Sequence, residues 1–159
     1  MGAAFTITKL DFSDDQKADI KSTWETLYSG NKFQLGVELM ANLFKAHPDY
    51  QDLFPSLKGI PDVAGSNELR GHAIRVITGI NNFVDALDEE EEVMREMLHN
   101  MARSHKPRKL TKTHFNEFAP ILLETFEKKV DMSSKARDAW IALYYSIVDN
   151  LFAEMAKLD

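Results

Sequence analysis

Apolar residues in this chain recur at intervals of three and four positions along almost its whole length. The segments at residues 20–27, 33–44, 69–87, 94–105, 115–126 and 140–155 all follow this spacing. Such a period places the apolar side chains on one face of an α-helix. No segment shows the strict alternation of apolar and polar residues that is typical of a half-buried strand. The sequence therefore predicts an all-α fold with at least six helices.

Capping residues and prolines mark the ends of these helices. Residues 11–13 offer capping side chains for the first helix, and Ser66 or Asn67 can cap the helix that follows them. The acidic run at residues 88–92 suits a helix N-terminus. Pro48 and Pro107 are expected to end the helices that precede them. Residues 50–66 contain two prolines and two glycines, so we predict turns there with one short helix.

Composition limits both the architecture and the class of function. With 159 residues, 44% of them hydrophobic, the chain suits one well-buried core. We therefore expect an N-terminal extension at residues 1–12 and one domain at residues 13–159. The net charge of -6 argues against a nucleic-acid partner. The lack of cysteine excludes thiolate chemistry and fits a cytoplasmic protein, and no run has transmembrane length.

His105 stands out because it combines an apolar helix face with a rigid helix end. It follows Leu98, Met101 and Ala102 at i, i+3, i+4 and i+7, so its ring should point inward. Pro107 then stops the helix. His105 is thus a candidate metal ligand, although a solvated or structurally paired histidine is the ordinary alternative.

A second inward histidine lies on another helix. His72 is at the edge of the apolar stripe at residues 69–87, one turn before Val76. His99 and His105 are six residues apart and point in different directions on a helix, so a shared zinc ion is not expected. Phosphate-binding, calcium-binding and nucleophile-elbow motifs are absent. What remains is His72 and His105, which could hold a flat metal cofactor between two helices.

Four fragments, in the right order and spacing, resemble the globin family. HPDYQDLFP places Phe54 where globins carry the phenylalanine that packs on the haem face. LRGHAIRV is similar to the distal helix, with His72 as the distal histidine. ARSHKPR followed by FNEF is similar to the proximal region, with His105 as the iron ligand. The fragments GVELMANLF, NELRGH and NNFVDALD resemble bivalve haemoglobins of the blood-clam type, and the resemblance covers the chain after residue 12.

The resemblance implies a globin fold of six to eight helices around a pocket for haem b (iron protoporphyrin IX). The implied function is reversible binding of O₂ and other diatomic gases at ferrous iron, for transport or storage, without a catalytic residue. His105 would bind the iron, and His72 would donate a hydrogen bond to O₂ or act as a sixth ligand. The other expected pocket residues are Met40, Phe54, Arg75, Val76, Leu98, Met101, Leu110 and Phe115.

The sequence allows alternative roles for Arg75 and for the two inward histidines. Arg75 is either a partner of a haem propionate or the bound ligand, or a solvated surface side chain. Bis-histidine coordination would suit redox chemistry or sensing, and the same pocket could serve a nitric-oxide dioxygenase or peroxidase. A haem-free adaptor domain would use both histidines as core residues.

Two further expectations concern partners. Blood-clam haemoglobins pair through their haem-bearing helices, so the resemblance implies a homodimer or another homo-oligomer. Asn100 and Met101 stand where that group has Lys-Phe, which leaves coupling between two haems open. The N-terminus MGAAFT fits the N-myristoylation pattern at Gly2, with Thr6 at the required offset. The alternative is an ordinary extension, and we expect membrane contact only if Gly2 is acylated.

Overall fold

The fold consists of helices joined by short turns, described for residues 9–158 in a computed structural model of the chain. The six α-helices are α1 (Asp14–Ser29), α2 (Lys32–Ala46), α3 (Asn67–Ala86), α4 (Glu91–His105), α5 (Lys112–Glu127) and α6 (Ser134–Ala156). Three short 3₁₀ helices are η2 (Pro48–Leu53), η3 (Val63–Gly65) and η4 (Lys106–Arg108). No strand occurs in this part of the chain, so the all-α prediction is confirmed. Gly2 and Thr6, the myristoylation residues, lie outside the described residues.

The helix starts are fixed by side-chain caps. The Ser13 hydroxyl accepts from the Gln16 backbone N–H at 3.1 Å, and the Gln16 side chain accepts from the Ser13 N–H at 2.9 Å. Ser66 caps α3 by accepting from the Leu69 N–H at 3.1 Å. Each cap satisfies a backbone donor that the first helical turn leaves free. Of the capping candidates that the sequence offered, residues 11–13 and Ser66 or Asn67, the structure uses Ser13 and Ser66.

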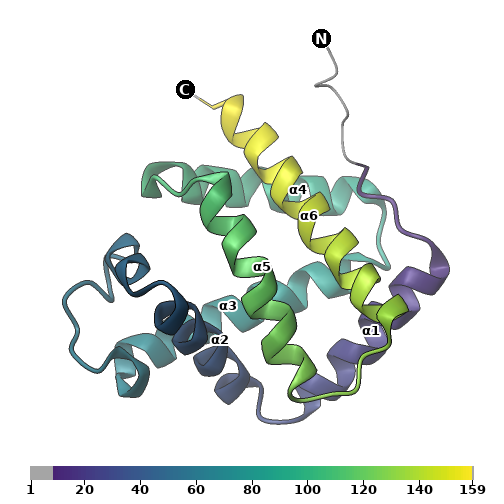
Figure 1. Cartoon of the computed structure of the whole chain (residues 1–159). Coiled ribbons are helices and arrows are strands. Elements are labelled where there is room, and N and C mark those ends of the chain that lie inside the picture. Colours follow the sequence, from purple (N-terminus) through teal and green to yellow (C-terminus); the bar gives the residue numbers. More distant parts are fainter. Residues whose placement is uncertain (1–8, 159) are drawn as a thin grey trace.

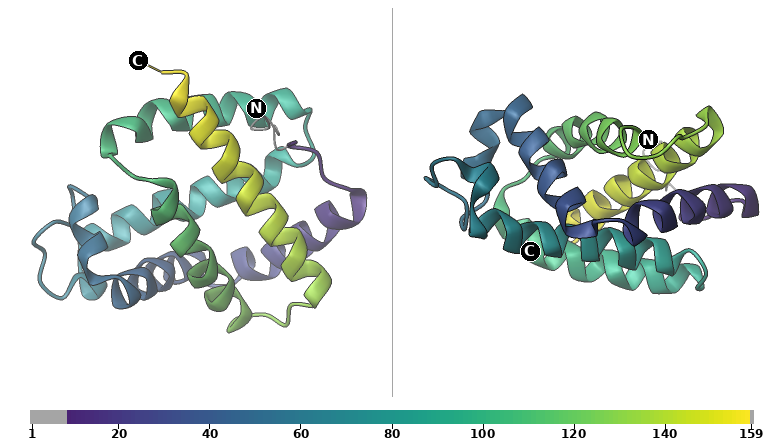
Figure 2. Two further views of the ribbon diagram at one scale, coloured as in Figure 1. Left: turned by 45° about the horizontal axis from the view of Figure 1, so that its top comes forward. Right: turned by 90° about the horizontal axis from the view of Figure 1, so that it is seen from below.

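The helices form two layers around the main hydrophobic core. In Figure 1, α5 and α6 lie in front of α3, while α4 crosses the top of the molecule. The view from below in Figure 2 shows α3 and α5 on opposite sides, with α1 and α6 between them. None of the helices in residues 9–158 combines the length and apolar character that a membrane span needs.

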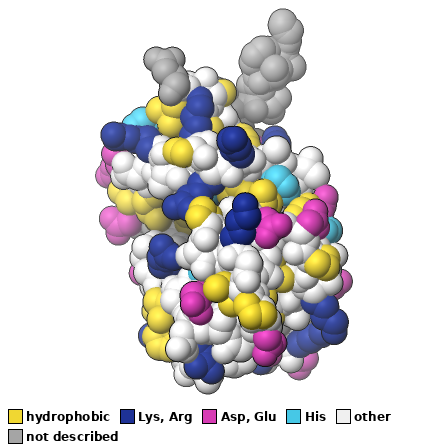
Figure 3. Space-filling view, turned by 90° about the vertical axis from the view of Figure 1, so that its left-hand side faces the viewer, with side chains coloured by type: hydrophobic (Ala, Val, Ile, Leu, Met, Phe, Trp, Pro, Cys, Tyr) yellow, Lys and Arg dark blue, Asp and Glu magenta, His cyan; other side chains and the backbone are white. Residues whose placement is uncertain are grey.

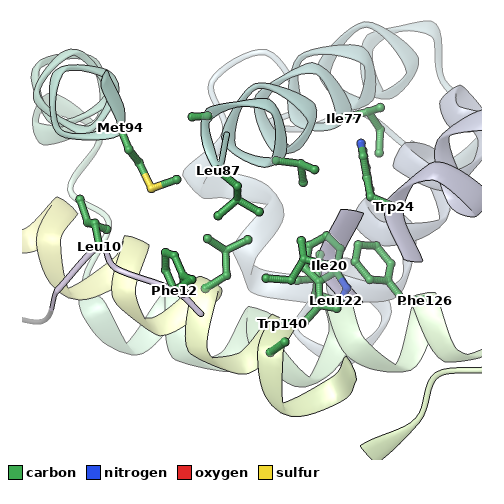
Figure 4. Close-up of a cluster of buried hydrophobic side chains, with 14 of the residues drawn as sticks. Leu10, Phe12, Ile20, Trp24, Ile77, Leu87, Met94, Leu122, Phe126 and Trp140 are labelled. Carbon is green, nitrogen blue, oxygen red and sulfur yellow. The ribbon is translucent and has the colours of Figure 1, made fainter. Parts of the chain in front are cut away.

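Aromatic rings hold α1, α5 and α6 together inside this core. The Trp24 ring lies 5.9 Å from Phe126 and 6.1 Å from Trp140, and Phe126 lies 5.1 Å from Trp140. Figure 4 shows these rings at one end of the core, with Leu10 and Phe12 at the other. Leu10 and Phe12 are both buried, so the residues just before α1 pack with the domain. The boundary after residue 12 stays a prediction.

Helix α3 has two apolar faces, which the sequence pattern merged into one stripe. Ala73 and Ile77 are fully buried toward α2, whereas His72 and Val76 are half-buried on the neighbouring face. The close approach of α2 depends on Gly36, because a Cβ there would lie 2.8 Å from the Ala73 carbonyl oxygen. The lack of a side chain at Gly36 therefore allows α2 and α3 to pack closely.

Candidate functional site

His105 is the last residue of α4, and a backbone hydrogen bond orients its half-buried ring. Its Nδ1 lies 3.0 Å from the carbonyl oxygen of Met101. A carbonyl can only accept, so this contact assigns the ring hydrogen to Nδ1 and leaves Nε2 with a free lone pair. Burial lowers the pKa of His105, an effect opposed by the Met101 bond and reinforced by the positive charge of Arg108. The ring is therefore neutral and oriented, as a metal ligand must be.

His72 projects from α3 and is also held neutral. Burial is the main cause that lowers its pKa to about 4, and the positive charges of Arg75 and Arg108, followed by the electrostatic influence of the nearby His105, lower it further. Its ring meets the Phe54 ring edge-on at a centroid distance of 4.9 Å. Within residues 9–158 the His72 ring has no hydrogen-bond partner, so a ring nitrogen stays available to a ligand.

The structure brings the two predicted histidines to one site. His105 lowers the pKa of His72 through their electrostatic interaction, and Arg108 lowers the pKa of both rings. These effects require the two rings and the guanidinium to lie close together. The sequence predicted only that His72 and His105 both face inward; their convergence from α3 and α4 is a property of the fold.

The distal part of the site has apolar walls. Met40 is buried in a cluster with Leu43, Phe44, Leu57 and Leu69, and the half-buried Phe54 and Val76 pack against it. The Phe54 and Phe44 rings meet edge-on at 5.6 Å. The predicted pocket residues Met40, Phe54 and Val76 thus lie together, and Phe54 links them to His72.

The predicted proximal residues lie along the other cluster. Leu98 is buried in the main core, and Met101 and Phe115 are half-buried against it. The Phe115 ring is 6.3 Å from the His105 ring. Leu110 is half-buried and belongs to neither cluster. Their contact with a cofactor stays a prediction, as it does for the distal wall.

Two arginines add positive charge beside the histidines. Arg75 is exposed on α3, and its charge reaches His72. Arg108 was missed by the sequence analysis, although it stands three residues after His105 in ARSHKPR. The linear pattern marks it as a cation but cannot show that it faces His72, which comes 36 positions earlier. Figure 3 shows Lys and Arg side chains scattered from top to bottom over the side on which α4 ends, among Asp and Glu side chains.

The remaining histidines are occupied by other partners. His47 lies 3.1 Å from Glu117, and His99 lies 3.2 Å from Glu154. His114 accepts from the Thr111 N–H at 2.9 Å in the cap of α5. All three side chains are half-buried, and each has a partner outside the site of His72 and His105.

The chemistry of the site fits a haem group better than a bare ion. No group of three His, Cys, Asp or Glu side chains able to hold a metal occurs in residues 9–158. A porphyrin supplies four nitrogen ligands of its own, so one oriented imidazole suffices, and Arg75 and Arg108 match its two carboxylates. A cavity of about 90 Å³ beside Leu10 and Met94 includes neither histidine in its lining and is too small for a porphyrin.

Comparison with known proteins gives a consistent result. Residues 37–151 match the family model described as Globin. The Globin-2 A chain of Anadara inaequivalvis is 30% identical over 142 residues, which cover 88% of this chain and 93% of that protein. This is a blood-clam chain, as the sequence resemblance indicated.

Solved structures agree at the level of the fold. Haemoglobin from the botfly Gasterophilus intestinalis superposes with a TM-score of 0.84 at 26% identity, covering 91% of this chain and 99% of that one. A hexa-coordinate haemoglobin of Drosophila melanogaster gives a TM-score of 0.82 at 22% identity, covering 89% and 94%, and supports the fold alone. The chain belongs to the globin family.

Proposed function

We propose that this globin binds O₂ reversibly at the ferrous iron of haem b, for transport or storage. The observation that carries the proposal is the pair of neutral imidazoles, His72 and His105, which converge from α3 and α4. Haem, when bound, supplies the ferrous centre that takes up a diatomic gas. The residues of the chain bind this group, orient it and control what reaches it.

Each side of the pocket has a distinct task. The Met101 bond to Nδ1 holds His105 with Nε2 available to the iron. On the other side, His72 offers a neutral N–H donor to a ligand that carries partial negative charge. Met40, Phe54 and Val76 exclude water, which slows oxidation of ferrous iron. Arg75 and Arg108 are the proposed partners of the haem carboxylates.

A haem titration tests this proposal. We expect the purified protein to bind one equivalent of haem and, once reduced, to show the two-banded visible spectrum of an oxygenated globin in air. Conversion to the ferric form within seconds would contradict O₂ storage or transport.

Six-coordinate haem is the second candidate, and one observation favours it. The His72 ring has no hydrogen-bond partner in the described chain and lies close to His105, so it is free to move onto the sixth position. The spectrum of the reduced protein without O₂ separates the two: sharp low-spin bands indicate two histidine ligands, and one broad band indicates His105 alone.

We also propose that the protein forms a homodimer. Ile74 on α3 and Val93 on α4 expose 44% and 41% of their surface, so both side chains are available to a second copy of the chain. Both helices carry a proposed haem contact. Light scattering should give twice the monomer mass, and Ile74→Asp should return the monomer. A wild-type protein that stays monomeric at the highest concentration at which it is soluble would contradict the dimer.

A further inference from the structure

Lys106, the residue directly after His105, reaches across to the end of α6. Its Nζ donates to the carbonyl oxygen of Met155 at 2.9 Å and also to the carbonyl oxygen of Leu158. Helix α6 ends at Ala156, so both acceptors belong to its last turn and the residues just beyond. The carbonyl end of a helix carries partial negative charge and lacks intrahelical donors. A lysine ammonium there is therefore well placed to bind.

A second link joins the same two elements. His99 Nδ1 lies 3.2 Å from Glu154 Oε1, and the other oxygen of Glu154 accepts from Lys157 at 2.8 Å. His99 and Lys106 are seven residues apart, which is two helical turns, so they share one side of the helical segment. Lys106 continues the helical path, because its N–H bonds to the Ala102 carbonyl. One side of the α4 segment is thus fastened to the last turn of α6.

His105 needs such a fastening because of its place in the chain. It is the final residue of α4, and helix ends fray more readily than helix interiors. The bond from Nδ1 to Met101 orients the ring, but Met101 belongs to the same last turn and would move with it. An anchor outside α4 is required to fix the backbone of His105 against the core.

We propose that Lys106 is a positioning residue for His105. By binding the carbonyl end of α6, it sets the position from which Nε2 of His105 meets the haem iron. In this contact the last turn of α6, which includes Glu154, is the anchor that fixes the position of the last turn of α4. This inference rests on the proposed haem function and assigns a role to the C-terminal end of the domain.

Substitution of Lys106 tests the proposal with matched controls. Lys106→Met keeps the approximate length of the side chain but removes its charge and its hydrogen-bond donors. Lys106→Arg keeps the charge and the hydrogen-bond donors. Lys109→Met removes a nearby exposed lysine whose side chain has no partner among the described residues. Ser133→Ala removes the N-cap of α6. It should lower thermal stability without affecting the last turn of α4, which carries His105. Glu154→Gln weakens the second link.

Two measurements report on the haem side. Resonance Raman spectra of the reduced protein without O₂ give the iron–histidine stretching band, and transfer of haem to an excess of haem-free myoglobin gives the rate of haem loss. We expect Lys106→Met to broaden the band and to lose haem about fivefold faster, as the loss of a charged hydrogen bond allows. Glu154→Gln should shift both in the same direction by less. Lys106→Arg and Lys109→Met should match the wild type in both measurements, and Ser133→Ala should keep the wild-type band.

The outcomes separate this inference from the function on which it rests. A wild-type protein that shows no Soret band with haem would overturn the proposed function, and the role of Lys106 with it. A normal Soret band combined with an unchanged stretching band in Lys106→Met would overturn the positioning role alone. Equal broadening in Ser133→Ala would also overturn it, because the effect would then follow from general loss of stability.

Discussion

At the scale of single residues, the proposed binding of haem and O₂ depends on two imidazoles that burial keeps neutral. His105 has one nitrogen committed to Met101 and the other free, whereas His72 has no fixed partner in the described chain. This difference separates a residue that binds the iron permanently from one that responds to a ligand. It also makes opposite predictions for their replacement.

His105→Gly should strongly weaken haem binding, because the variant lacks the imidazole whose free Nε2 is proposed to bind the iron. Added imidazole should restore the Soret band, since the vacated space accepts a free ligand of the same chemistry. Absorption spectra with and without imidazole check this. Undiminished haem affinity in the variant without imidazole would contradict the assignment.

His72→Leu should leave haem bound and should speed O₂ dissociation by about ten- to a hundredfold, as expected for the loss of a hydrogen bond to a partly charged ligand. His72→Gln retains a donor and should give an intermediate rate. Stopped-flow mixing of the oxygenated protein with CO measures all three rates. Equal rates for Leu and wild type would show that His72 does not contact the ligand.

At the scale of helices, two contacts decide how the site is held, and neither is visible in the linear pattern. The first is the approach of α2 to α3 at Gly36, where a Cβ would meet the Ala73 carbonyl at 2.8 Å and Ile77 at 2.7 Å. The second is the fastening of α4 to the last turn of α6. Both join residues that are far apart in sequence.

Gly36→Ala should lower the free energy of unfolding by about 1–3 kcal/mol, because the backbone of α3 cannot move aside as a flexible side chain can. Gly79→Ala is the matched control: it also lies inside a helix, but its Cβ would meet nothing within 4 Å. That variant should be unchanged or more stable by up to about 1 kcal/mol. Urea unfolding of the haem-free protein provides the comparison, and equal effects would refute the close contact.

Glu154 gives the α4–α6 contact a defined pH dependence. The hydrogen bond from Lys157, and then that from His99, lower its pKa, although partial burial opposes them. A carboxyl group with a lowered folded pKa stabilises the protein above its unfolded pKa, and this stabilisation is lost as the pH falls through the folded pKa. Glu154→Gln should therefore lower the Tm by about 1–3 °C at pH 7, and the difference should shrink below pH 4. Glu96→Gln, at an exposed residue of α4, should show no such trend.

At the scale of the whole molecule, the sequence predicted what depends on local spacing. Helix phase placed His72 and His105 inward, caps at Ser13 and Ser66 fixed two helix starts, and Pro107 marked the end of α4. These features depend only on residues that are close together in the sequence, so the linear sequence is enough to predict them. The family resemblance then supplied the fold, which the structure confirms.

Other features required the folded chain. Arg108 reaches the distal histidine only because α3 and α4 converge, and Lys106 reaches Leu158 across 52 positions. The face of α3 that packs on α2 can be distinguished from the face that carries His72 only in the folded chain, where α2 approaches α3 closely at Gly36. In each case the deciding contact joins distant segments, and helical periodicity carries no information about it.

The central claim is that this pocket holds haem and binds O₂ reversibly. The most direct test takes the reduced, haem-loaded protein through repeated cycles of exposure to O₂ and removal of O₂, and records the visible spectrum at each step. We expect the visible spectrum of the protein to return completely to the same ferrous form after every cycle. Progressive accumulation of ferric protein within the first cycles, or an O₂-free spectrum that O₂ does not change, would contradict it.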